Sequence, residues 1–196
     1  TTAVKMLCGM SIANISFDPD LAEDLVFDKK LADACMAIFN LDGDEATYCA
    51  AVTLCNLSKL DSANILADTV AIPLLVKIIA RGPVACIQMA VVALCNFSMM
   101  PVFYDQLTHI DKEGKGALPS LTSVISAPAM HEKIKLDALQ ALYNVVTKHE
   151  ESWVPAVNSE VIAALAKLLK PPGSTDEAHM PNCIRIGRIV KELSFA

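Results

Sequence analysis

One short pattern recurs along the chain every 40 to 48 residues, and this recurrence restricts the fold more than any other feature. An alignment on the asparagine of "LCNLS" places Asn14, Asn56, Asn96 and Asn144 in one column, with Glu192 in the same place at the end. Two positions before the column stand Ile12, Leu54, Leu94, Leu142 and Val190. Six positions before it stand Cys8, Ala50, Ala90, Ala138 and Ile186, which are mostly small. The chain is therefore built from repeats.

Each period has the pattern of three helices. Apolar residues at positions −6, −2 and +1 from the asparagine follow the i, i+4, i+7 spacing of a buried helix face. A second helical pattern precedes each of these segments: "LADACMAIF", "IPLLVKII", "LPSLTSVI" and "VIAALAKLL". A shorter and more polar pattern comes before that: "DLAEDLVF", "SANILADT", "FYDQLTHI" and "ESWVPAVN". We expect a single domain with a leading helix over 1–16 and repeats over 18–58, 60–98, 100–148 and 151–196.

The segment "IPLLVKII", followed after a short loop by "MAVVALCNFS", resembles the armadillo repeat family. The family pattern is Gly/Ala-Ile-Pro-x-Leu-Val in the second helix and Ala-x-x-Ala-Leu-x-Asn-Leu-Ser in the third. The match is strong over 60–98, good over 18–58 and 100–148, and loose over 151–196. HEAT repeats are the near alternative, but they usually have two helices per period. The resemblance implies an all-α, right-handed superhelical solenoid of three-helix repeats.

The resemblance also implies a binding groove, because the third helices of armadillo proteins line a concave face. The column asparagines of the family commonly hydrogen-bond the backbone of an extended ligand. The predicted groove residues are Asn14, Asn56, Asn96, Asn144, Tyr48, Val52, Gln88, Val92, Gln140 and Arg188. In a second interpretation, each asparagine satisfies its own helix end or the next loop.

The chain departs from two known kinds of armadillo groove. Importin-alpha carries a tryptophan four positions before the asparagine, whereas this chain has Met10, Val52, Val92, Gln140 and Arg188 there. Beta-catenin-like grooves are strongly basic, but the third helices at 46–58 and 84–98 carry no Lys or Arg except Lys59 at one boundary. The middle of the groove is therefore neutral and apolar. Three interpretations are open: the groove binds an apolar helix or an extended segment, the array packs permanently in an assembly, or most of these residues belong to the core.

No constellation for catalysis is visible. His109, His131, His149 and His179 are far apart, and P-loop, GxGxxG and GxSxG motifs are absent. The seven cysteines form no CxxC pair, so we expect reduced, buried thiols and no nucleophilic role for Cys95. We predict a protein that is not an enzyme and has no cofactor or metal. An enzyme with an armadillo accessory region would need its active site outside these residues.

Composition narrows the class of partner. The net charge of −6 argues against general nucleic-acid binding, and residues 1–68 hold eleven acids and four bases while the remainder is +1. No apolar run is long enough to cross a bilayer, and no signal peptide is visible, so we expect a cytoplasmic protein with no membrane insertion. The acidic stretch at 18–28 is either a solvated face or a steering surface for a basic partner.

Two insertions and the leading helix lead to further expectations. Two insertions, 109–116 and 171–180, are predicted as exposed loops. The leading helix has Lys5 as its only charge and is a poor cap, so we expect further repeats before Thr1. The predicted function is a non-catalytic scaffold, or a structural subunit of a multi-protein complex such as a cytoskeletal or ciliary one. The alternative is an importin-like transport adaptor that recognises an extended peptide.

Overall fold

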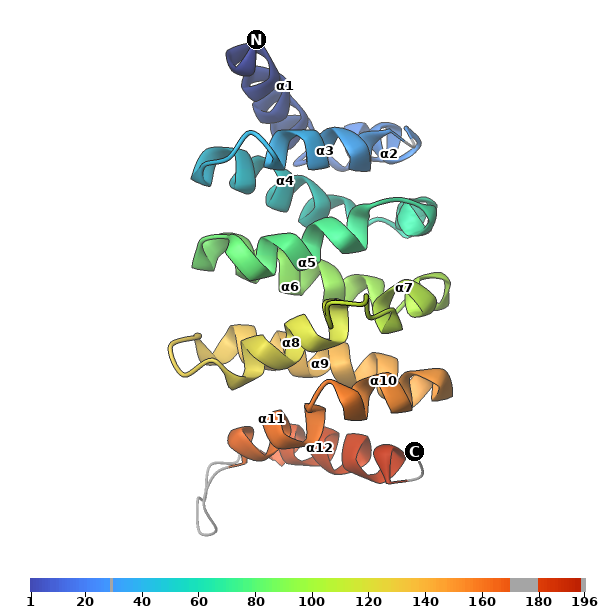
Figure 1. Ribbon diagram of the computed structural model, residues 1–196. Helices are drawn as coiled ribbons and strands as arrows, with labels where there is room; N and C mark the ends of the chain where they lie inside the picture. Colours follow the sequence, from blue (N-terminus) through green and yellow to red (C-terminus); the bar gives the residue numbers. More distant parts are fainter. Residues whose placement is uncertain (29, 170–179, 195–196) are drawn as a thin grey trace.

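The computed structural model describes residues 1–28, 30–169 and 180–194, and in this part of the chain the helices stack from the N-terminal to the C-terminal end (Figure 1). The third helices form one layer: α1 Thr2–Ile15, α4 Asp44–Leu57, α6 Val84–Phe97, α9 Glu132–Lys148 and α12 Met180–Leu193. The second helices are α3 Leu31–Phe39, α5 Ala71–Arg81, α8 Ala117–Ser126 and α11 Val161–Leu168. The first three pack against α4, α6 and α9, whereas α11 packs mainly against α8. The predicted all-α solenoid of three-helix repeats is confirmed.

The first helices are shorter and less regular than the other two. They are α2 Pro19–Val26, the 3₁₀ helix η1 Asp61–Asp68, η2 Pro101–Phe103 with α7 Tyr104–Thr108, and η3 Glu150–Ser152 with α10 Trp153–Asn158. In η1, Ala63 and Leu66 are fully buried, and their three-residue spacing matches one turn of a 3₁₀ helix. The pattern "SANILADT" predicts a helix there, but it does not predict the tighter winding of that helix.

The repeating columns explain how the layers pack. The small residues Ala50, Ala90 and Ala138 are fully buried, so the third helices approach their neighbours closely at these points. The leucines Leu54 and Leu94, four positions later, fill the space beside them. One continuous core therefore runs through the repeats, from α2 to α12.

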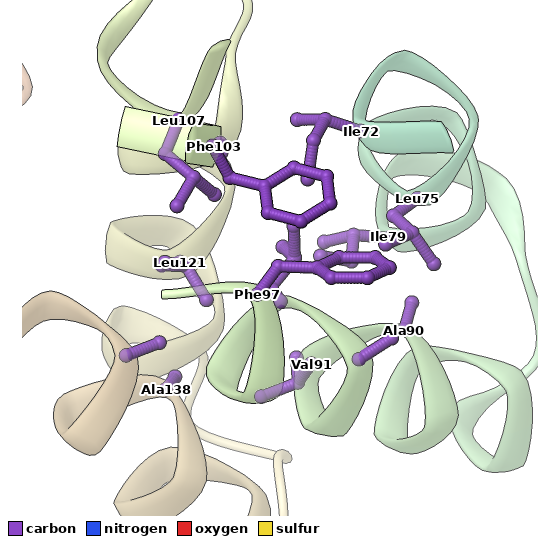
Figure 2. Close-up of a cluster of buried hydrophobic side chains, with 14 of the residues drawn as sticks. Ile72, Leu75, Ile79, Ala90, Val91, Phe97, Phe103, Leu107, Leu121 and Ala138 are labelled. Atoms are coloured by element: carbon purple, nitrogen blue, oxygen red, sulfur yellow. The ribbon is translucent and has the colours of Figure 1, made fainter. Parts of the chain in front are cut away.

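A pair of aromatic rings joins one repeat to the next. Phe97 ends α6, and Phe103 lies in η2 of the following repeat; both are fully buried. Figure 2 shows the two rings stacked beneath Ile72 and above Val91, and their centroids are 4.4 Å apart with an interplanar angle of 30°. Stacking of this kind adds to the area that both rings bury. The connection between the repeats is thus part of the core.

The acidic stretch at 18–28 has partly structural roles. Asp18 caps α2, and its carboxylate accepts hydrogen bonds from the backbone N–H groups of Asp20 and Leu21 at 3.0 and 3.2 Å. Glu23 accepts a hydrogen bond from the Ser62 hydroxyl in the next repeat. These contacts give the two acids structural roles that neither the solvated-face nor the steering interpretation included. Steering of a basic partner by the remaining acids stays a prediction.

The predicted loop at 109–116 is an ordered turn between α7 and α8. The Asp111 carboxylate accepts hydrogen bonds from the backbone N–H groups of Glu113 and Lys115, both at 2.8 Å. The bond from Lys115 is the main cause that lowers the pKa of Asp111. Residues 109 and 111–115 are exposed, as predicted. The second predicted loop, 171–180, lies outside the described residues up to position 179, and Met180 begins α12.

The leading helix α1 has an uncovered apolar face. Val4, Leu7 and Met10 are exposed, and Leu7 is 63% exposed. Cys8 is exposed as well, which corrects the expectation that every cysteine is buried, because no described helix covers this side of α1. All seven thiols are free, and Cys95 and Cys183 are half-buried.

No single helix of the described residues is long and apolar enough to cross a membrane. Two pairs pass the length and composition test only together: 61–68 with 71–81, and 84–97 with 101–108, with bends of 88° and 115° between the partners.

Candidate functional site

The predicted groove residues lie on one face of the third helices. Positions −8, −4 and −1 from the column asparagine follow a helical i, i+4, i+7 spacing, so in every repeat they share one side. We call these positions the groove face: Tyr48, Val52 and Cys55 in α4; Gln88, Val92 and Cys95 in α6; Leu136, Gln140 and Tyr143 in α9; Ile184, Arg188 and Lys191 in α12. In α6 and α9 all of these side chains are half-exposed. In α4 only Tyr48 of these three is exposed, since Val52 and Cys55 are buried, so the strip of accessible side chains runs over α6, α9 and α12 and is interrupted in α4.

The column asparagines form a ladder between repeats. Asn56 Nδ2 donates to Ser16 Oγ at 3.1 Å, and Asn96 Nδ2 donates to Ser58 Oγ at 2.9 Å. Asn144 Nδ2 donates to Ser98 Oγ, also at 2.9 Å. Each of these serines ends the third helix of the preceding repeat and donates to a carbonyl of its own last turn. Each asparagine thus fixes the register between two third helices.

This ladder differs from both predicted roles of the asparagines. The partner is the end of the preceding helix, whereas the sequence analysis considered the ligand, the residue's own helix end or the next loop. The amide of Asn144 is also engaged at its oxygen, which accepts from Gln140 at 2.8 Å, and the residue is 5% exposed. Asn56 Oδ1 accepts from Lys59 at 3.0 Å. Within the described chain, Asn96 is the one of these three whose side-chain oxygen accepts no hydrogen bond, so both of its lone pairs are open to a ligand.

The other predicted groove residues fall into accessible and inaccessible groups. Val52 is 4% exposed and packs with Ala13, Ile38 and Cys49 in a small cluster, so the structure corrects its expected place on an open surface. The cause is the close approach of α1, which covers that side of α4. Tyr48 is 44% exposed, and Arg188 and Asn14 are also exposed. The binding roles of these side chains remain predictions.

A cavity of about 480 Å³ lies at the N-terminal end of the groove face. Met10, Phe17 and Tyr48 contribute exposed apolar surface to it, and all three belong to α1, α4 or the turn after α1. Asp44 and Glu45, in the first turn of α4, line its edge. The cavity has an apolar lining and is large enough to take up more than one apolar side chain.

A second cavity, of about 390 Å³, lies between α9 and α12 at the C-terminal end. Arg185 and Arg188 line it together with Tyr143. Arg188 Nη1 donates to the Tyr143 hydroxyl at 2.8 Å, and Arg185 Nη1 donates to Asn182 Oδ1 at 3.1 Å. These bonds hold both guanidinium groups at the cavity while leaving other N–H donors free.

Burial raises the pKa of two groups that lie between these cavities, Cys95 and Asp137. It raises the pKa of the Cys95 thiol to about 11; Asp137 adds to the rise and Arg185 opposes it. Burial also raises the pKa of the Asp137 carboxyl, with Lys133 opposing. Because the thiolate is the reactive form, a pKa this high supports the expectation that Cys95 is not a nucleophile.

One cluster could hold a metal ion. Asp105, His149 and Glu151 place one ligand atom each within 4.8 Å of one another. His149 Nε2 is buried without a hydrogen bond among the described residues, and it lies 3.9 Å from Glu151 Oε2. Imidazole and carboxylate are a donor set that Zn²⁺ accepts. The sequence alone does not reveal this cluster, because Asp105 and His149 come together only when α7 folds against the end of α9. His179 lies outside the described residues.

Other residues of the groove were also missed. Met10 and Phe17 border the first cavity, and Tyr143 and Arg185 border the second. Tyr143 lies one position before Asn144, and Arg185 lies seven positions before Glu192. A comparison of the repeats at these two positions could have identified both residues. The family pattern contains a serine two positions after the asparagine, but nothing in a single repeat shows that the next repeat supplies the partner of this serine.

The chain is similar to known proteins in structure. No family model matches the sequence, and no curated protein matches it. A computationally designed armadillo repeat protein for modular peptide recognition is similar, with a TM-score of 0.71, 20% identity, and coverage of 96% of this chain and 76% of the other. A designed armadillo repeat protein in complex with the peptide (KR)4 gives a TM-score of 0.64, 17% identity and coverage of 98% and 77%.

An engineered protein gives a TM-score of 0.70 at 18% identity, with coverage of 99% of this chain and 79% of the other. Identities this low establish the fold alone. The fold that this chain shares with the designed proteins agrees with the recurring pattern in its sequence, and so do the Asn–Ser hydrogen bonds between its repeats. The chain is therefore an armadillo-type repeat solenoid.

Proposed function

We propose that this protein is a non-catalytic interaction module that binds an extended segment of a partner protein along its third helices. The observation that carries the proposal is the groove face, a strip of accessible side chains with a cavity at either end. Asn96 supplies a carbonyl acceptor in the middle of the strip, and a peptide backbone N–H can donate to it. Peptide recognition by designed armadillo proteins of the same fold supports the proposal.

The test is selection of peptides of about twelve residues, a length matched to the groove, on the immobilised chain. Binding of a selected peptide is then compared between Val92→Glu and Val102→Glu. Val92 lies half-exposed on the groove face, and Val102 is exposed on η2, outside it. We expect Val92→Glu to abolish binding and Val102→Glu to leave it unchanged. Equal binding by both variants, or no selected peptide, would contradict the proposal.

A second candidate function is that of a permanent subunit of a larger assembly, cytoskeletal or ciliary, in the cytoplasm. Val4 and Leu7 of α1 are exposed, and an apolar face of this kind can pack against a neighbouring subunit or against a further repeat of the same protein. Leu7→Glu distinguishes the two functions, since it alters this face without touching the cavity at Tyr48. Loss of co-purifying subunits with Leu7→Glu, but not with Val92→Glu, would support assembly. Localisation is tested by imaging the tagged protein.

An importin-like adaptor for basic peptides is the less favoured alternative. Position −4, where importin-alpha has tryptophan, holds Arg188 in the last repeat, and this guanidinium would repel lysine and arginine side chains. A selection that returns mainly basic peptides would reverse this preference.

A further inference from the structure

The charges of the third helices are separated along the solenoid. The described α4 carries Asp44 and Glu45 and no base, and α6 carries no charge at all. The charges of α12 are Arg185, Arg188, Lys191 and Glu192. Helix α9 carries charges of both signs, but its groove-face positions are uncharged. The groove face thus runs from an acidic edge at α4, through uncharged positions of α6 and α9, to a basic end at α12.

The basic end is prepared for a carboxylate. Arg188 is oriented by Tyr143 and Arg185 by Asn182, while each guanidinium retains N–H donors in its planar fork. No ion pair involves either arginine in the described part of the chain, although Glu192 stands one turn after Arg188. Asp137, at position −7 of α9, also forms no ion pair there. Two arginines one helical turn apart at one cavity match an acidic side chain, which a guanidinium binds through paired hydrogen bonds.

The opposite end excludes such a group. The cavity at Met10, Phe17 and Tyr48 is apolar, and its edge carries Asp44 and Glu45. Lys5, the one charge of α1, does not line this cavity. An acidic residue placed there would meet two carboxylates, whereas an apolar residue would bury surface. The two ends therefore impose one orientation on a ligand that has different chemistry at its ends.

The separation of the ends fixes the spacing of these groups in the ligand. Three helix-to-helix steps lead from α4 through α6 and α9 to α12, and at 8–10 Å per step they cover about 24 to 30 Å. An extended peptide rises about 3.3 Å per residue, so about seven to nine residues bridge this distance.

We propose that the ligand is an extended peptide with an apolar residue in the α1–α4 cavity and one or more acidic residues at Arg185 and Arg188, about seven to nine residues away. The inference rests on the proposed function, because it names the chemistry of the peptide that the groove binds. In the uncharged middle of the groove, Asn96 accepts a hydrogen bond from the peptide backbone and Val92 contacts an apolar part of the peptide. Asp44 and Glu45 keep the acidic end of the peptide at α12.

The experiment repeats the peptide selection on three forms of the chain. One is the natural chain, the second is Arg185→Glu/Arg188→Glu, and the third is Lys148→Glu/Lys167→Glu. The third variant is a matched control, because it reverses the same number of charges at exposed lysines on α9 and α11, outside the groove face. Circular dichroism melting of all three forms checks that they are folded. The best natural-chain peptide is then titrated against each form by fluorescence anisotropy.

We expect the natural chain and the control to select peptides with acidic residues clustered toward one end and apolar residues toward the other. We expect Arg185→Glu/Arg188→Glu to lose the acidic cluster and to bind the natural-chain peptide about tenfold more weakly or worse. The control should bind it within about twofold of the natural chain. Replacing the acidic residues of the peptide by glutamine should remove this difference between the forms.

Two results would overturn the inference in different ways. Selected peptides without acidic enrichment, whose binding still depends on Val92, would refute the acidic ligand and leave the proposed function in place. No selected peptide on any folded form would refute the proposed function together with the inference.

Discussion

Asn96 Nδ2 donates a 2.9 Å hydrogen bond to Ser58 Oγ, which links the third helices of two successive repeats. Ser58 in turn donates to the carbonyl of Cys55 at 2.8 Å, so both polar groups are satisfied where α4 ends. The same arrangement joins Asn56 to Ser16 and Asn144 to Ser98. The primary role of the recurring asparagine is therefore structural, because it links one repeat to the next.

Removal of this link should destabilise the fold. We expect Asn96→Ala to lower the free energy of unfolding by about 1 kcal/mol, the net contribution of one such hydrogen bond. A double-mutant cycle with Ser58→Ala, measured by urea unfolding, should give a coupling energy of about 1 kcal/mol. Asn64→Ala, at an exposed position of η1, is the control and should have little effect. A coupling energy of zero would show that the contact contributes nothing.

The aromatic pair between repeats should be among the most sensitive positions. Phe97 and Phe103 are fully buried and stacked, so Phe103→Ala leaves a cavity and removes a ring contact. We expect a loss of about 3 to 5 kcal/mol in the free energy of unfolding. Phe27→Ala, where the ring is 64% exposed, is the matched control and should cost far less. Similar effects of the two substitutions in thermal melting would contradict the packing in Figure 2.

The thiols should differ sharply in reactivity. Burial raises the pKa of Cys35 to about 12, with Cys49 adding to the rise, and the pKa of Cys95 is about 11. At pH 8 a thiol with a pKa near 11 is thiolate in only about one molecule in a thousand, so attack on a disulfide reagent is slow. Cys8 is exposed and should react first. Titration with Ellman's reagent should show a fast phase that Cys8→Ser removes; a fast phase that persists in this variant would refute the assignment.

Asp137 should make stability depend on pH in a definite direction. Burial raises the pKa of this carboxyl, so the folded state binds its proton more tightly than the unfolded state does. The charged form therefore opposes folding above the raised pKa, and this cost disappears as pH falls below the unfolded value. We expect Asp137→Asn to raise Tm by about 1 to 3 °C at pH 7 and to have no such benefit near pH 3. A variant that is less stable at pH 7 would mean that the Asp137 charge stabilises the fold.

Much of the fold followed from the sequence. The asparagine column, the small residues six positions before it and the apolar residues around it predicted the third helices α4, α6 and α9. The apolar patterns "IPLLVKII" and "LPSLTSVI" predicted the second helices α5 and α8. These features are local, because helix periodicity is set by residues within a few turns. The winding of η1 as a 3₁₀ helix was not predicted, since it depends on how Ala63 and Leu66 meet the neighbouring helices.

The candidate site was only partly predictable. The spacing placed Tyr48, Val92 and Arg188 on one face, but it placed Val52 there as well, and α1 buries that side chain. The sequence by itself determined the period, the helices and the face that each residue occupies. Only the tertiary structure decided that Ser58 receives the Asn96 amide, that Tyr143 orients Arg188, and which positions of the face stay open. The physical reason is that a helix sets its own periodicity locally, whereas burial and hydrogen-bond partners across repeats depend on how closely the neighbouring helices approach.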